Sequence, residues 1–225
     1  MYIDYRWVQT RLTALGFNPG PIDGVRGPRT DAAVVAFKRS IGFWARPYIG
    51  PLTLEALKSA DPDRSDIPWM AEAQRVRGLH EQRNRSQLRT WFDASVNWID
   101  PMKVPWCAAF VATCLRKWQP GIALPENPLG ARNWGRFGQP CHPVFGAILV
   151  FWRGSPQGWQ GHVGFYAGQD PDCFHVLGGN QSNAVTVTRI ARTRLLKARW
   201  PEDEPITGRP VSLTSAGVPI TTNEA

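Results

Sequence analysis

Apolar residues recur at helical spacing through the first sixty residues of the chain. Val8, Leu12 and Leu15 occupy positions i, i+4 and i+7, and residues 33–41 repeat that spacing. Leucines within residues 54–57 indicate a third, short helix. Each segment therefore presents one apolar stripe to a shared core, and the pattern predicts a small three-helix bundle over this region.

The pattern changes in residues 67–200, where helical periodicity comes first and strand-like runs follow. The helical segments are residues 69–77, 88–96 and 106–118, and the strand-like segments are 147–152, 162–167, 173–177 and 184–188. Helices followed by strands indicate an α+β domain. Residues 61–66 have the composition of a linker, and residues 201–225 that of a loosely ordered tail.

Length and charge narrow the class of protein. In 225 residues with 43% hydrophobic content, no apolar run approaches the roughly 20 residues of a membrane span. We therefore expect a soluble monomer without stable membrane insertion, and no signal peptide is visible. The net charge of +8 favours an anionic partner such as nucleic acid, a membrane surface or a cell wall. Nucleic acid is disfavoured because no recognition motif or arginine-aromatic stripe is present.

The basic residues are scattered, with their densest stretch late in the chain. That stretch holds Arg189, Arg192, Arg194, Lys197 and Arg199. We interpret it as a solvated surface in preference to an anion-binding strip, because so short a cluster is usually solvated.

The four cysteines show no CxxC spacing, so we expect neither a zinc site nor a redox pair. Reduced thiols are the default, and a bridge between Cys141 and Cys173 stays open. His80 and His142 have no carboxylate or cysteine at ligand spacing, so the sequence predicts no metal and no cofactor.

Cys107 and His162 are the candidates for nucleophilic chemistry. Pro105 should begin a helix, which places Cys107 in its first turn, where free N–H groups and the helix dipole favour a thiolate. Cys114 lies two turns deeper on the same stripe and is expected to be a buried small hydrophobe. His162 begins a strand behind Gly161, where its ring can reach a helix terminus. The two residues together suggest a thiol nucleophile and its base.

The third member of the site has two candidates. Asn180 follows a strand in a Gly-Gly-Asn-Gln turn, and its amide oxygen could accept a hydrogen bond from the imidazole. His175 could do the same if it faces the site, but strand alternation does not settle its direction. We favour Asn180. The tryptophans that could line a substrate groove are Trp106, Trp134, Trp152 and Trp159, for each of which core packing is an equal alternative.

The first region resembles peptidoglycan-binding modules of the three-helix type. The resemblance rests on the Asp-Gly-x-x-Gly-Pro-x-Thr loop at residues 23–30 and on the Gly-Pro-x-Thr entry to the last helix within residues 49–57. It implies that residues 1–60 bind the bacterial cell wall. It does not identify the side chains that contact glycan.

The second region resembles the cysteine, histidine-dependent amidohydrolase/peptidase (CHAP) group and the related NlpC/P60 peptidases, which cleave peptidoglycan. The matching segments are residues 104–111, 146–151, 161–166 and 177–183. The resemblance implies a papain-like fold with N-terminal helices and an antiparallel sheet. It also implies that Cys107 is the nucleophile, His162 the base and Asn180 the third residue. His175 is one residue out of step with the second histidine of many NlpC/P60 members.

A wall binder joined to a wall hydrolase resembles a bacteriophage endolysin. Such an enzyme accumulates in the host cytoplasm and reaches peptidoglycan once the membrane is breached; a toxin delivered by a contractile machine fits the same sequence. The expected reaction is hydrolysis of the sugar–alanine amide or of a peptide cross-link, which the sequence does not distinguish. The alternative is a non-catalytic wall-binding or virion structural protein with a buried cysteine.

Overall fold

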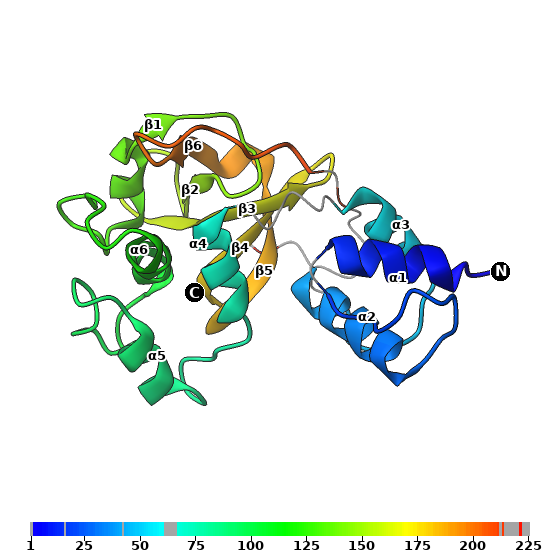
Figure 1. Ribbon diagram of the computed structural model, residues 1–225. Coiled ribbons are helices and arrows are strands. Elements are labelled where there is room, and N and C mark those ends of the chain that lie inside the picture. The colour runs from blue at the N-terminus through cyan, green and yellow to red at the C-terminus, as the bar shows by residue number, and fades with distance from the viewer. Residues whose placement is uncertain are drawn as a thin grey trace. The chain divides into compact units, whose positions relative to one another are not determined.

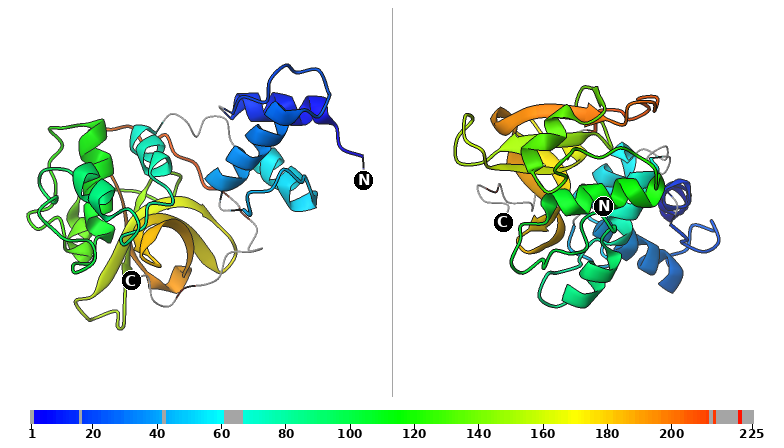
Figure 2. Two further views of the ribbon diagram at one scale, coloured as in Figure 1. Left: turned by 90° about the horizontal axis from the view of Figure 1, so that it is seen from below. Right: turned by 90° about the vertical axis from the view of Figure 1, so that its left-hand side faces the viewer.

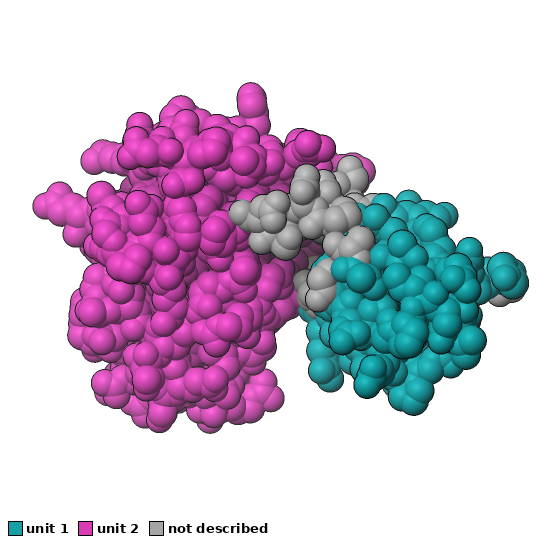
Figure 3. Space-filling view, in the orientation of Figure 1, with its two compact units in different colours: residues 1–66, 212–217 teal, residues 67–211, 218–225 magenta. Residues whose placement is uncertain are grey.

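The computed structural model describes residues 2–15, 17–41, 43–60, 67–211, 213 and 221. The chain divides into two compact units, residues 1–66 with 212–217 and residues 67–211 with 218–225 (Figure 3). We call these unit 1 and unit 2. The predicted linker at 61–66 lies outside the described residues, as does most of the predicted tail beyond Val211.

Unit 1 contains the helices α1 (Tyr5–Ala14), α2 (Pro28–Ser40) and α3 (Pro51–Ser59). Prolines begin α2 and α3, where a missing N–H costs nothing, and Asp4 caps α1 by accepting from the backbone N–H of Trp7 at 3.0 Å. The apolar stripes meet in a core of Val8, Leu12, Ala33, Val34, Phe37, Ile49, Leu57 and Ala60. The predicted helical pattern is confirmed.

The loop between α1 and α2 is held by one buried glutamine. Gln9, 1% exposed, donates from Nε2 to the Asp23 carboxylate at 2.9 Å and to the Val25 carbonyl at 3.0 Å. Its Oε1 accepts from the N–H of Gly24 at 2.8 Å. Gly24 has a φ of +79°, which explains the glycine of the Asp-Gly motif.

Unit 2 begins with the helices α4 (Pro68–Arg75), α5 (Arg85–Trp91) and α6 (Cys107–Trp118), followed by the 3₁₀ helix η2 (Ala131–Arg136). A six-stranded sheet then forms from β1 (Gln139–Pro140), β2 (Ile148–Trp152), β3 (Gly161–Gln169), β4 (Cys173–Gln181), β5 (Ala184–Ala191) and β6 (Leu195–Trp200). The 3₁₀ helix η3 (Arg192–Arg194) joins β5 to β6.

The strand order is β1-β6-β2-β3-β4-β5, and all neighbouring strands are antiparallel. Helix α6 packs on β3 and β4 and also contacts α4 (Figure 1). Figure 2 shows that the sheet is strongly curved beside these helices. The predicted α+β class with an antiparallel sheet is confirmed.

Two local predictions differ from the structure. The helix expected over residues 88–96 ends at Trp91. The Gly-Gly-Asn-Gln segment is not a turn: it lies within β4 as a β-bulge, with a register shift between Gly178 and Gln181. The turn comes next, at Ser182 and Asn183, whose φ values of +52° and +62° suit a tight hairpin.

The predicted loose tail also differs over its described part. The Phe145 N–H donates to the Arg209 carbonyl at 2.9 Å, and the Gln169 N–H donates to the Val211 carbonyl at 2.7 Å. The Tyr166 hydroxyl accepts from the N–H of Val211 at 3.1 Å. Residues 201–211 are therefore fastened to the sheet of unit 2.

The basic stretch is only in part the solvated surface that its composition predicts. Arg192 and Lys197 are exposed, whereas Arg189 and Arg194 are each 8% exposed. Arg194 donates to the Trp152 carbonyl at 3.0 and 3.1 Å, and Arg199 donates to the Gly135 carbonyl at 2.7 Å. The guanidinium groups of Arg194 and Arg199 therefore join strands and loops by satisfying backbone carbonyls.

Candidate functional site

The first turn of α6 rests directly on β4. Trp106 precedes Cys107, is fully buried and donates its indole N–H to the Glu81 carboxylate at 3.0 Å. A Cβ atom on Gly179 would lie 2.6 Å from both Trp106 and Phe110. Only glycine permits this approach, so Gly179 allows the start of α6 to lie against the strand.

Cys107 is the first residue of α6 and is 7% exposed. Burial raises the pKa of its thiol, whereas hydrogen bonds from the N–H groups of Val163 and Ala108 and the charge of Arg153 act to lower it. The net direction of the pKa is upward, because burial outweighs these hydrogen bonds, and burial therefore opposes the thiolate that the helix start was expected to favour. The contact with Val163 places the sulfur beside β3, at the residue that follows His162 in the chain.

His162 is 1% exposed, and its Nε2 atom lies 3.0 Å from Oε1 of Gln181. Gln181 donates from its Nε2 to the Val176 carbonyl at 3.1 Å and to the Thr186 carbonyl at 2.5 Å. Because two carbonyls require a donor, the amide oxygen must face His162. That oxygen can only accept, so Nε2 of the imidazole carries a proton.

A second glycine makes room for this pair. A Cβ atom on Gly178 would lie 2.8 Å from Oε1 of Gln181 and 3.3 Å from Nε2 of His162. Gly178 and Gly179 thus serve two sides of one site: the first admits the His162–Gln181 pair, and the second admits the start of α6.

The amide that contacts His162 comes from Gln181, one residue beyond the predicted Asn180. Asn180 lies in the bulge with a φ of +57° and is 6% exposed. The amide of Gln181 made it a possible partner of His162 in the sequence. The alternation of apolar and polar residues, however, does not show where a strand contains a bulge, and the bulge decides which amide faces the histidine.

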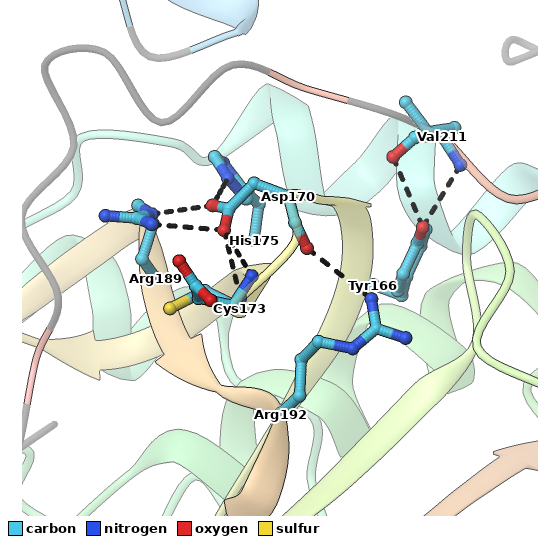
Figure 4. Close-up of polar contacts among 8 residues, drawn as sticks. Tyr166, Asp170, Cys173, His175, Arg189, Arg192 and Val211 are labelled. Carbon is cyan, nitrogen blue, oxygen red and sulfur yellow. Dashed lines mark hydrogen bonds and ion pairs between the residues drawn. The ribbon is translucent and has the colours of Figure 1, made fainter.

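His175, the alternative third residue, belongs to a separate buried cluster (Figure 4). Its Nε2 lies 2.7 Å from the Asp170 carboxylate, which also accepts from Arg189 at 2.7 and 3.1 Å. The N–H groups of Asp172 and Cys173 each donate to the same carboxylate at 3.0 Å. We call Asp170, His175 and Arg189 the Asp170 cluster.

The charges of the Asp170 cluster are fixed by its surroundings. Burial alone would raise the pKa of Asp170, but the hydrogen bonds from Arg189 and His175 hold it well below its usual range. Burial lowers the pKa of His175, although Asp170 opposes this. The cluster therefore holds an ionised Asp170–Arg189 pair beside a neutral imidazole.

The four tryptophans proposed for a groove differ in exposure. Trp106 and Trp134 are fully buried and pack in the core, and Trp134 donates to the Pro128 carbonyl at 3.0 Å. Trp152 is partly buried and donates to the Thr193 carbonyl at 3.2 Å. Trp159 is 85% exposed on the connection between β2 and β3. Of the four, Trp159 is the ring open to a ligand.

Other kinds of site have less support. Within the described ranges, no three His, Cys, Asp or Glu residues are grouped to hold a metal ion. No helix in the described part of the chain is long and apolar enough to span a membrane. All four cysteines are free thiols. A pocket of about 410 Å³ lined by Gln119 and Glu202–Glu204 lies beyond the C-terminal end of α6, whereas Cys107 lies at its start.

The comparison with protein families concerns unit 1. Residues 3–57 match the family "Putative peptidoglycan binding domain". The "Putative OxPP cycle protein OpcA" of a Synechocystis species is 42% identical over 53 residues, which are 24% of this chain and 11% of that protein. The match thus spans about a ninth of the relative. No solved structure matches the chain significantly. The chain carries a peptidoglycan-binding domain at residues 3–57, followed by an α+β domain with an antiparallel sheet.

Proposed function

We propose that unit 2 is a thiol-dependent hydrolase that cleaves an amide bond of peptidoglycan. Cys107 is the nucleophile, His162 the base, and Gln181, in place of Asn180, orients the imidazole. The observation that carries the proposal is the oriented amide of Gln181 on Nε2 of His162, 3.0 Å away, with Val163 bonding the Cys107 sulfur.

The mechanism follows from the protonation states. With its pKa raised by burial, the Cys107 thiol rests protonated and gives its proton to Nδ1 of His162 as sulfur attacks the amide carbon. The C–N bond then breaks, and Nδ1–H protonates the leaving amine. Water, deprotonated by the same nitrogen, then attacks the thioester carbon; the C–S bond breaks, the carboxylic acid leaves, and Nδ1–H returns the proton to sulfur. Throughout, Gln181 accepts from Nε2–H and keeps the ring in place.

The start of α6 supplies the stabilisation that the tetrahedral intermediate needs. The first N–H groups of a helix have no intrahelical partner, so those at Cys107 and Ala108 can donate to the oxyanion. They already point toward the sulfur, since the Ala108 N–H bonds to it.

Trp159 is the proposed contact for substrate outside this centre. Arg132 donates to the carbonyls of Gln160 at 2.7 Å, Pro156 at 2.9 Å and Ser155 at 2.9 Å, which fixes the β2–β3 connection. The exposed ring is thus held on a rigid loop, two residues before β3 begins at Gly161. A fixed aromatic ring can bind the wall without losing much conformational entropy.

The peptidoglycan-binding domain supports the choice of substrate, because it would hold unit 2 at the wall. The proposed setting is that of a phage endolysin, which acts on the wall after release through a breached membrane. The bond is either the sugar–alanine amide or a peptide cross-link.

The test is product analysis on purified peptidoglycan. Wild-type protein should release new amino groups without new reducing ends, and mass spectrometry of the fragments identifies the bond. Cys107→Ala should release none, whereas Cys114→Ala, which removes another buried thiol from the same helix, should retain activity in its folded fraction. Equal release by wild type and Cys107→Ala would favour the non-catalytic wall-binding or virion protein.

A further inference from the structure

The loop between α2 and α3 exposes two large aromatic rings on unit 1. Within residues 43–50, which we call the aromatic loop, Trp44 is 77% exposed and Tyr48 is 66% exposed. Rings of this size are usually covered, because burial of their apolar surface stabilises the folded chain. Ile49 of the same loop is 2% exposed. The loop therefore buries Ile49 in the core and leaves two of its three aromatic rings, those of Trp44 and Tyr48, in water, while Phe43 is partly buried.

Trp44 has one face covered and one face free for a ligand. The guanidinium carbon of Arg46 lies 3.9 Å from the centre of the Trp44 ring, and the Arg46 N–H donates to the Trp44 carbonyl at 2.8 Å. The tight backbone turn and the stacked cation together fix the ring. Because Arg46 occupies one side, the large exposure belongs mainly to the opposite face.

Tyr48 is held from the other end of the aromatic loop. Nζ of the buried Lys38 donates to the Tyr48 carbonyl and lies 5.9 Å from the centre of its ring. A Cβ atom on Gly50 would lie 2.8 Å from Cε1 of Tyr48, so the ring packs against the glycine. Arg26 donates to the Pro47 carbonyl at 3.4 Å. These contacts preorganise the loop, which reduces the entropy lost when a ligand binds.

We propose that Trp44 and Tyr48 bind the sugar rings of the peptidoglycan glycan strand, in preference to its stem peptide. A pyranose ring has an apolar face of C–H groups that packs on an aromatic ring, and the face of Trp44 opposite Arg46 is open to such a contact. The aromatic loop lies within the matched residues 3–57. The proposal rests on that peptidoglycan-binding domain and not on the hydrolase activity of unit 2.

The experiment measures sedimentation with insoluble peptidoglycan, using the full chain with Cys107→Ala so that the wall is not digested. Trp44→Ala should weaken binding about 10-fold and Tyr48→Ala several-fold, as for aromatic residues at the centre of an interface. Trp44→Leu, which keeps an apolar side chain without a ring face, should lose about as much. Trp98→Ala removes a ring from unit 2 that is 68% exposed and should change binding less than about 2-fold.

Competition identifies the ligand. Glycan strands stripped of peptide should displace the protein from the wall, and free stem peptides should not. Unchanged binding by both loop variants overturns the proposal, as does displacement by stem peptides alone. Hydrolysis of soluble muropeptides by wild-type protein is measured separately. If no hydrolysis is found but the loop variants still bind the wall more weakly, the proposed hydrolase is refuted and the proposed glycan-binding role of the aromatic loop stands.

Discussion

Unit 2 contains two buried histidines on neighbouring strands, and each has its Nε2 atom at a side-chain oxygen. His162 lies 3.0 Å from the amide oxygen of Gln181, and His175 lies 2.7 Å from the carboxylate of Asp170. Both rings are almost inaccessible to solvent, at 1% and 2% exposure. Burial and a hydrogen bond therefore do not distinguish a histidine suited to chemistry from one suited to stability. The charge of the partner does.

A neutral amide orients a ring without fixing its charge. Gln181 can accept from Nε2–H whether or not Nδ1 carries a proton, so His162 can gain and lose a proton during a reaction. Asp170 is paired with Arg189 and bonded by two backbone N–H groups, so protonating it or removing its partner would break a complete network. The second arrangement fastens the β3–β4 turn to β5.

Replacing each histidine by alanine should have the largest effects, on turnover for His162 and on stability for His175. His162→Ala should lower kcat/KM by about 10³- to 10⁴-fold with little change in fold, because the base is lost. His175→Ala should destabilise the protein by about 1–3 kcal/mol, because a buried carboxylate oxygen loses its donor, and leave the folded fraction active. Muropeptide turnover and urea unfolding on the same samples measure both. Loss of turnover by folded His175→Ala would contradict the comparison.

Asp170→Asn should have the next largest effect, on stability. It leaves the buried Arg189 without a charged partner, which costs about 3–5 kcal/mol. The folded-state pKa of Asp170 lies below its unfolded value. Its stabilisation is therefore fully present above the unfolded pKa of about 4 and is lost as pH falls through the folded-state pKa.

Urea unfolding at a series of pH values tests this. The wild-type unfolding free energy should fall with decreasing pH below about 4 more steeply than that of Asp170→Asn. Equal slopes would mean that Asp170 does not carry the acid sensitivity.

Substitutions of Gln181 should have a smaller effect, and on catalysis. Gln181→Ala frees the imidazole to rotate and should lower kcat about 10- to 100-fold. Gln181→Glu places a carboxylate at Nε2, which raises the pKa of His162 and should move the acid limb of the kcat/KM profile to higher pH. The second variant gives His162 a partner of the type that His175 has. A profile that does not move would show that residue 181 does not act on the base.

The sequence predicts the parts of this molecule that depend on local pattern. Pro105 before an apolar stripe places Cys107 at the start of a helix, and Gly161 before alternating residues places His162 on a strand. Partnerships set by strand register were missed. Asp170 and Arg189 meet only because β4 and β5 pair with His175 opposite Arg189. Gln181 was not predicted, because an Asn that follows glycine favours a turn. In the structure Asn180 instead lies in a β-bulge.

Replacement of Asn180 should have the smallest effect. It tests most directly whether Asn180 or Gln181 supplies the amide that orients His162. Asn180→Gly keeps the backbone path of the bulge, since glycine adopts a φ of +57° without strain, and removes only the side chain. We expect kcat/KM to change less than about 3-fold and stability to change by at most about 1 kcal/mol, because relief of the left-handed conformation offsets the greater freedom of the unfolded chain. Turnover and thermal unfolding should be measured beside Gln181→Ala. If Asn180→Gly loses as much turnover as Gln181→Ala while remaining folded, the orienting amide is that of Asn180, and the contact of Gln181 with His162 serves only the fold.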